Sequence, residues 1–201
     1  MRLIVISWLE TFEGEVETIN ALFCAGMEIL HLRKPGMGAE ALGRLIEGID
    51  ERYWGRLTVH YLPEVAERYG VGGYHLSAGR PGAPMGWSGR VSVSCHSVEE
   101  LRSLRGCVDY AFLSPIYDSI SKHGYRAGFT TEELDKARKE GVLDENVVAL
   151  GGITVDRVGE CRDMGFGGVA VVGGVWEGGG GVDGVVGRWR EYKEKCAKDD
   201  N

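Results

Sequence analysis

Short apolar runs rich in β-branched and aromatic residues recur along the chain and alternate with stretches that have helical spacing. The runs predict eight strands, at residues 2–7, 27–33, 57–62, 73–77, 91–95, 110–114, 146–152 and 168–174. Between most of them, segments with charged faces predict helices, at residues 15–26, 39–53, 62–70, 97–106, 130–141 and 154–165. Several of these segments end at a glycine suited to a helix C-cap.

The alternation of strand and helix predicts a parallel sheet, and strands that are apolar along their whole length predict a sheet covered on both faces. Eight units in 201 residues leave about 25 residues each, which favours an α/β fold of the small (β/α)8 TIM-barrel type. Segment 78–89, "AGRPGAPMGWSG", is expected to be a loop without a full helix. An open, doubly wound sheet is the alternative fold.

Composition narrows the class of partner. The chain is 43% hydrophobic, enough to bury the core of a single domain spanning residues 1–201. A net charge of -7 and a pI near 5.3 argue against nucleic acid and anionic membranes as partners and leave room for a small anionic metabolite. No signal peptide or membrane span is evident, so we expect a cytoplasmic protein, and a homo-oligomer is compatible with the sequence.

The five cysteines are far apart and form no CxxC pair, so we expect reduced core or surface thiols rather than disulfides or a zinc site. No metal-ligating set is predicted.

Glycine pairs close the last two predicted strands. Gly151-Gly152 and Gly173-Gly174 stand where a barrel of this type binds phosphate, at the ends of strands seven and eight. Glycine lets backbone amides approach an anion closely, and the segment from Thr154 could add a helix N-terminus. Either pair alone could instead make a tight turn.

Other strand ends carry polar side chains. His31 and Arg33 share one face of the second strand, and His60 ends the third. An apolar strand has little reason to hold these groups unless the face meets a ligand, although Arg33 could also pair with a carboxylate at the rim. Ser94, on the fifth strand, is a further candidate ligand, whereas His96 fits a structural role at the start of a helix.

The segment after strand six, "FLSPIYDSISKHGYRAGF", gathers groups that bind phosphate. Ser119, Ser121 and Lys122 can donate hydrogen bonds to phosphate oxygens, and Gly124 and Gly128 would let the loop fold over the site. We therefore expect a lid over a phosphorylated ligand.

Five segments, in this order along the chain, resemble motifs of the thiamine phosphate synthase and thiazole tautomerase (TenI-like) superfamily. They are "LHLRKPG", "VGGYHLS", "VSVSCHSVEEL", "FLSPIYDSISK" and "VVALGGI". The resemblance implies a barrel, an enzyme of thiamine biosynthesis, and a phosphorylated thiazole or pyrimidine as its substrate.

The resemblance also implies roles for individual residues. In the family, two hydroxyls of the loop after strand six hold thiazole phosphate and its lysine holds a pyrimidine diphosphate, which here are Ser119, Ser121 and Lys122. Arg33 matches the diphosphate arginine, and Ser94 matches a serine near the pyrophosphate. The glycine pairs Gly151-Gly152 and Gly173-Gly174 match the thiazole-phosphate cradle.

The departures from the family pattern bear on the reaction. Synthases of the family bind magnesium through two aspartates, whose places are taken here by Tyr61 and about Arg80, and His60 replaces the asparagine before the first. The histidine of the tautomerases corresponds to Pro115, so His31, His123 and Lys122 are the candidate catalytic residues. No cofactor is predicted, and magnesium would be needed only by a synthase.

Three functions remain open. The first is a thiazole tautomerase-like isomerase, favoured because the magnesium aspartates are missing. The second is a divergent thiamine phosphate synthase, a transferase that joins the pyrimidine diphosphate to thiazole phosphate. The third is a catalytically silent barrel that binds a thiazole or thiamine phosphate.

Overall fold

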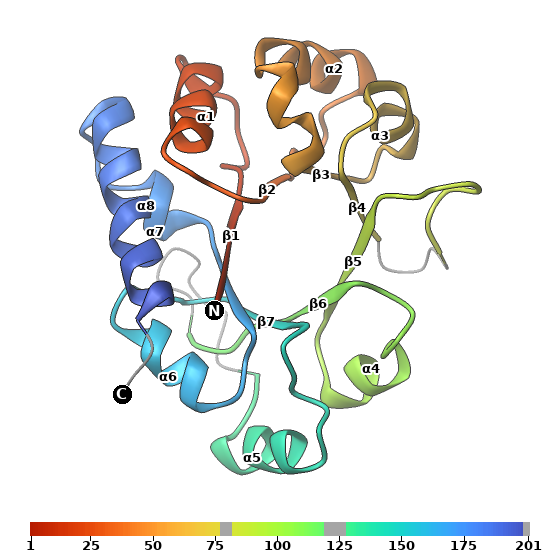
Figure 1. The fold of residues 1–201 in the computed structure, drawn as a ribbon, viewed down its shortest axis with the longest axis vertical. Coiled ribbons are helices and arrows are strands. Elements are labelled where there is room, and N and C mark those ends of the chain that lie inside the picture. The colour runs from red at the N-terminus through yellow and green to blue at the C-terminus, as the bar shows by residue number, and fades with distance from the viewer. Residues whose placement is uncertain (77–81, 119–127, 199–201) are drawn as a thin grey trace.

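Eight parallel strands close into a barrel in the computed structural model, which describes residues 1–76, 82–118 and 128–198. Each strand pairs with the next in the chain, and β8 returns to pair with β1 (Figure 1). The strands are β1 (Arg2–Ile6), β2 (Leu30–Leu32), β3 (Leu57–His60), β4 (Gly73–His75), β5 (Arg90–Cys95), β6 (Tyr110–Leu113), β7 (Val147–Leu150) and β8 (Gly168–Val171). The predicted (β/α)8 barrel is confirmed, and the open doubly wound alternative is excluded.

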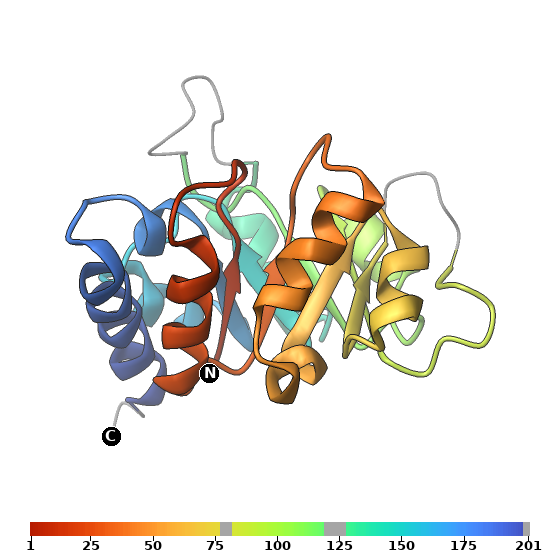
Figure 2. The ribbon, with the colours of Figure 1, turned by 90° about the horizontal axis from the view of Figure 1, so that it is seen from above.

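Helices lie around the outside of the barrel (Figures 1 and 2). They are α1 (Glu15–Cys24), α2 (Ala39–Gly48), α3 (Pro63–Tyr69), α4 (Val98–Ser103), α5 (Thr131–Lys139), α6 (Arg157–Asp163), α7 (Gly173–Trp176) and α8 (Gly181–Ala197), with a 3-10 helix η1 (Glu51–Arg56). The predicted helix over 39–53 is divided, because Ile49 and Asp50 adopt extended or irregular backbone between α2 and η1. No helix occurs over 82–89, the described part of the predicted loop between β4 and β5.

Two ends of predicted strands need correction. The strand expected over 168–174 ends at Val171, and Gly173-Gly174 form the first turn of α7 rather than a strand end. The strand expected over 146–152 ends at Leu150, and Gly151-Gly152 form the bend that follows it, both with positive φ. In each case the glycines stop the strand sooner than the apolar pattern implied.

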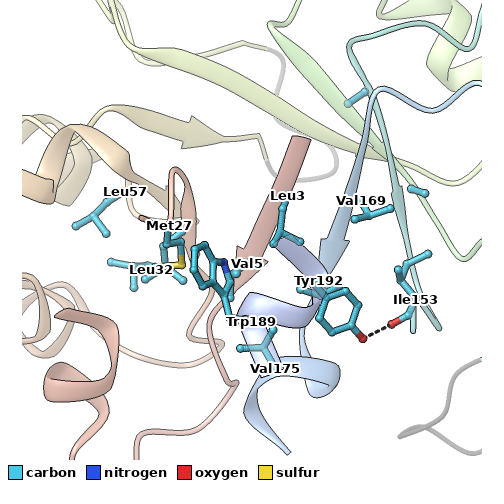
Figure 3. Packing of buried hydrophobic residues seen from close by; sticks show 14 of the residues in the cluster. Leu3, Val5, Met27, Leu32, Leu57, Ile153, Val169, Val175, Trp189 and Tyr192 are labelled. Atoms are coloured by element: carbon cyan, nitrogen blue, oxygen red, sulfur yellow. Dashed lines mark hydrogen bonds between the residues drawn. The ribbon is translucent and has the colours of Figure 1, made fainter. Parts of the chain in front are cut away.

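Helix α8 was not among the predicted helices, although it is the longest helix that the structure describes. Its buried face contributes Trp189 and Tyr192 to the layer between the helices and the barrel (Figure 3). The Tyr192 hydroxyl donates to the carbonyl of Ile153 over 3.0 Å, so a buried polar group on α8 is satisfied by the turn after β7. Removal of a buried Trp side chain of this kind typically costs about 3–5 kcal/mol.

The interior of the barrel is divided into two halves. Strands β6, β7, β8 and β1 fill one half with apolar side chains, from Ile4, Ile6, Phe112, Val148 and Ala170. Strands β2 to β5 place buried polar side chains in the other half, from His31, Thr58, His60, His75 and Ser92. A packed interior holds so many polar groups only where they can bond to one another or serve a site.

All five cysteines are free: Cys95, Cys161 and Cys196 are buried, and Cys24 and Cys107 are exposed. The cysteines are therefore divided between the core and the surface, which are the two locations predicted for them. Within the described ranges, no helix has the length and apolar character needed to cross a membrane.

Candidate active site at the carboxyl ends of the strands

The ends of β2 and β3 meet at one edge of the barrel. Arg33 Nε donates to the Tyr61 hydroxyl over 3.2 Å, and Tyr61 is the one non-glycine residue with positive φ in the described ranges, at 69°. A bulky residue held in this conformation costs about 1–3 kcal/mol, and such strain concentrates at functional sites. The pair presents a guanidinium and a phenol at the mouth of the barrel.

Lys34, next to Arg33, does not contribute its charge to the mouth. Its ammonium forms a buried ion pair with Glu15, at the start of α1, and donates to the carbonyl of Glu10 over 2.9 Å. Burial lowers the pKa of Lys34 and raises that of Glu15, and the pairing opposes both shifts. Arg33 is therefore the residue of this basic pair that is available to a ligand.

A chain of buried hydrogen bonds runs inward from this edge. His60 Nε2 lies 2.9 Å from His31 Nδ1, and His31 Nε2 lies 2.6 Å from the Tyr110 hydroxyl. His31 is fully buried, and His60 is 5% exposed. Because both ring nitrogens of His31 have partners and the ring has no exposed surface, His31 is not open to direct contact at the mouth of the barrel.

His75 forms a second branch. Its Nδ1 lies 2.8 Å from Ser92 Oγ and its Nε2 lies 3.0 Å from Ser94 Oγ, while its ring stacks on that of His60 with centroids 4.1 Å apart. Ser94, predicted as a phosphate ligand, is thus bonded to His75 in this structure.

All three imidazoles are held neutral. Burial lowers the pKa of His31 and His60 well below the ordinary value, and neighbouring imidazoles add to the effect. Burial, with the nearby Arg33 guanidinium, lowers the pKa of His75 to about 3. A neutral imidazole can accept a proton or bind a metal ion, but these three are weak bases.

The turn after β7 is built tightly against the segment after β6. Gly151 has φ 97° and Gly152 has φ 65°. A Cβ on Gly151 would lie 3.0 Å from Pro115 Cα, and one on Gly152 would collide with the carbonyl oxygen of Asp118. These glycines therefore have a packing role in addition to the predicted phosphate contact.

Arg157, which was not among the predicted site residues, stabilises the same turn. Its Nη1 donates to the carbonyl of Gly152 over 2.7 Å, and its guanidinium lies 4.4 Å from the centre of the Tyr117 ring. The Tyr117 hydroxyl in turn donates to Glu160 over 2.9 Å. The sequence feature that could have indicated this role is a basic residue at the start of the helix that follows the Gly-Gly turn.

The turn after β8 has different neighbours from those of the turn after β7. A Cβ on Gly174 would collide with the Tyr192 hydroxyl, and one on Gly173 would lie 3.0 Å from a carboxylate oxygen of Glu177. The exposed Glu177 side chain therefore places a negative charge beside this turn.

Four predicted site residues, Ser119, Ser121, Lys122 and His123, lie outside the described residues, as does Arg80. Their predicted roles stay predictions. The flanking Asp118 and Gly128 are described, and the Gly128 amide donates to the carbonyl of Pro115 over 2.9 Å. The two ends of the predicted lid therefore meet beside the Gly151-Gly152 turn.

Of the two magnesium-binding aspartate positions of the family, the structure describes the one taken by Tyr61, and the residues there do not suit magnesium. Mg²⁺ prefers oxygen ligands, above all carboxylates. The residues at the end of β3 are His60 and Tyr61, and the Tyr61 hydroxyl already accepts a hydrogen bond from the Arg33 guanidinium. A cation placed there would meet a positive charge instead of a carboxylate.

A closed parallel barrel with glycine turns after β7 and polar groups at its mouth is the architecture of TIM-barrel proteins that bind small phosphorylated molecules. The model of one family, described as thiamine monophosphate synthase, matches residues 3–175. The chain belongs to this family.

Individual relatives agree with this assignment. A thiamine-phosphate synthase of Serratia proteamaculans is 32% identical over 172 residues, 78% of each chain. A crystal structure of thiamine phosphate pyrophosphorylase from Bacteroides thetaiotaomicron is 36% identical with a TM-score of 0.89, covering 100% of both chains. The corresponding protein of Pyrococcus furiosus shares the fold, with a TM-score of 0.73 at 21% identity over 98% of this chain and 97% of its own.

Proposed function

We propose that this family member is an enzyme of thiamine biosynthesis that binds a thiazole monophosphate and moves a proton on it without magnesium, as a thiazole tautomerase does. The observation that carries the proposal is the Arg33–Tyr61 pair, which stands where the family resemblance places a magnesium-binding aspartate. Expulsion of pyrophosphate normally relies on a metal ion to stabilise the leaving group, whereas proton transfer does not.

The phosphate would be held at the turn after β7. The backbone of Gly151-Gly152 supplies amides that an anion can approach, and Arg157 keeps the turn in place through the Gly152 carbonyl. Ser119, Ser121 and Lys122 would close over the phosphate, with Gly173-Gly174 on its other side. Because the Gly151-Gly152 turn packs against the start of this loop, ligand binding and loop position should be coupled.

Proton transfer needs a base near the thiazole ring, and two routes are available. In one, neutral His60 accepts the proton and passes its own Nε2 proton to His31 Nδ1 across the 2.9 Å contact. In the other, His123 of the loop acts directly. Return of the proton to a different atom of the ring completes an isomerisation with no change in composition.

A second candidate, the synthase reaction, is favoured by the relatives. The similar proteins of Serratia proteamaculans and Bacteroides thetaiotaomicron are named for it. In that case Arg33, Lys122 and Arg80 would replace magnesium as a cationic clamp around the diphosphate of the pyrimidine substrate, and His60, which burial keeps neutral, could contribute only a hydrogen bond.

Two assays separate these functions. Exchange of deuterium from solvent into a thiazole monophosphate, followed by NMR with no pyrimidine present, should occur for a tautomerase. Formation of thiamine phosphate from both substrates, with and without magnesium, should occur only for a synthase. Condensation without isotope exchange would refute the proposal, and tight binding of the thiazole phosphate with neither reaction would identify a catalytically silent binding protein.

A further inference from the structure

Three histidines from consecutive strands meet inside the barrel. His31 of β2, His60 of β3 and His75 of β4 each offer a ring nitrogen, and these three atoms lie within 4.8 Å of one another. In the ranges 1–76, 82–118 and 128–198, no other group of three histidine, cysteine or acidic residues is so placed. The strand register explains the meeting: His60 pairs with His75, and His31 pairs with Thr58, one inward position below His60.

We propose that His31, His60 and His75 bind a transition-metal ion of the zinc type. Three imidazoles and a water molecule are an established ligand set of four-coordinate Zn²⁺, and imidazole also suits the neighbouring Co²⁺, Ni²⁺ and Cu²⁺ ions. The site differs in place and chemistry from any magnesium site, because it lies within the barrel and offers nitrogen in place of oxygen. It does not rest on the proposed function.

The distances between the three histidine nitrogens are close to those that a bound zinc ion requires. Zn–N bonds of about 2.0–2.1 Å in a tetrahedron separate the nitrogens by about 3.3 Å. His31 and His60 are already 2.9 Å apart, so an ion would replace their mutual hydrogen bond. The widest of the three separations is within 4.8 Å, which ring rotations that move the nitrogens by about 1–2 Å would close.

Hydroxyl groups around the cluster can orient the rings. The Tyr110 hydroxyl lies 2.6 Å from His31 Nε2, on the side away from His60. Ser92 and Ser94 lie at the two nitrogens of His75, so metal binding through one nitrogen would replace one of these hydrogen bonds and leave the other in place. An imidazole that binds a metal through one nitrogen donates through the other to such a partner, which fixes its tautomer and orientation.

The charged residues around the three histidines affect how tightly the proposed site should bind a metal ion. Arg33 lies close enough to His60 and His75, and Arg90 close enough to His31, to disfavour positive charge on the rings. These guanidinium groups should weaken the binding of a dication. Replacing Arg33 by glutamine should therefore tighten binding, a result that adventitious metal binding at the surface would not show.

Zinc is the probe for the test, with the full chain in a Cys24→Ser, Cys107→Ser background that removes the exposed thiols. After treatment with a chelator, calorimetry should show one Zn²⁺ bound per chain, and Co²⁺ should give the absorption of a four-coordinate site. His60→Gln should abolish this binding. His96→Ala is the matched control, because His96 is an exposed histidine outside the cluster, and it should bind like the parent.

Two conservative variants keep the test decisive if His60→Gln does not fold. Tyr110→Phe keeps all three ligands and removes the hydroxyl beside His31, and it should weaken zinc binding by about 10- to 100-fold. Arg33→Gln should tighten it. No stoichiometric binding by the parent, equal binding by folded His60→Gln, or unchanged affinity in both conservative variants would overturn the proposal.

A bound ion and a transferred proton would compete for the same nitrogens. Zinc should therefore suppress an isomerisation that runs through His60 and leave one based on His123 unaffected. Zinc binding itself is measured without substrate, so its failure would leave the proposed function standing.

Discussion

Arg33 Nε donates to the Tyr61 hydroxyl over 3.2 Å, across the ends of β2 and β3. Tyr61 stands where the family resemblance places a magnesium-binding aspartate. A phenol and the neighbouring guanidinium are therefore found there in place of a carboxylate. Any activity should therefore be insensitive to EDTA and unchanged by added Mg²⁺. The measurement is the initial rate in chelator and in magnesium; a rate lost in EDTA and restored by magnesium would refute this prediction. Relief of inhibition when a chelator removes zinc is a separate effect, and a zinc-free preparation controls for it.

Lys122 should contribute to ligand binding more than its neighbour His123. A charge-assisted contact to phosphate is worth on the order of 1.5–3 kcal/mol, so Lys122→Ala should weaken the binding of a thiazole monophosphate by roughly 10- to 100-fold. His123→Ala should leave affinity near that of the parent and lower the rate only if His123 is the base. Titration and rate are measured on both variants in one buffer. Parent-like binding by Lys122→Ala would mean that the loop is an ordinary solvated connection.

Gly152→Ala should both destabilise the protein and weaken phosphate binding. The residue has φ 65°, and an added Cβ would meet the carbonyl oxygen of Asp118. A non-glycine residue in this conformation costs about 1–3 kcal/mol, and the displaced segment carries the predicted lid. Chemical denaturation and calorimetry test the two effects, with Gly159→Ala as control because a Cβ there has no neighbour within 4 Å. An unchanged denaturation midpoint in Gly152→Ala would contradict the structure of this turn.

Stability of the metal-free protein should fall as the pH is lowered. The pKa of His75 is about 3 in the folded chain and about 6.5 when unfolded, so between these values the unfolded chain binds more protons. The contribution is fully present above pH 6.5 and is lost on acidification by up to about 1.4 kcal/mol per pH unit. His31 and His60 shift in the same direction and should steepen the slope.

Urea denaturation at a series of pH values measures this slope. His75→Asn should flatten this slope by about one proton. Equal slopes in the parent and in His75→Asn would show that His75 is not held neutral by burial.

The fold followed from the sequence more completely than the site did. The strand runs were long enough, and their apolar character strong enough, to predict all eight strands and their parallel order. Helix α8 was missed because the glycine-rich stretch before it obscured its start, while Trp189 and Tyr192 recur at a spacing that one face of a helix would give. Boundaries failed where glycine intervened, as at Gly173.

Residues of the site were predicted individually but not as a group. His31 and His60 were recognised as polar residues on apolar strands, yet their mutual contact and that with Tyr110 depend on the register of neighbouring strands, which no local pattern shows. The pairing of Lys34 with Glu15 likewise joins distant segments. Arg157 acts through the Gly152 carbonyl, a backbone contact that a motif does not reveal.

The divided interior of the barrel has a consequence for local opening. Strands β6, β7, β8 and β1 share the apolar filling around Phe112 and Val148, while β2 to β4 enclose polar groups and have only three or four residues each. Local opening on the polar side should cost less, because the inward-facing side chains there are polar and opening exposes less apolar interior than around Phe112 and Val148. Native-state hydrogen exchange should accordingly be slowest for the amides of β1, β7 and β8 and faster for those of β2 and β4. Metal binding by His31, His60 and His75 should then slow exchange mainly on the polar side, because all three ligands of the proposed site belong to β2, β3 and β4. The rigidity of these strands would then depend on whether that site is occupied.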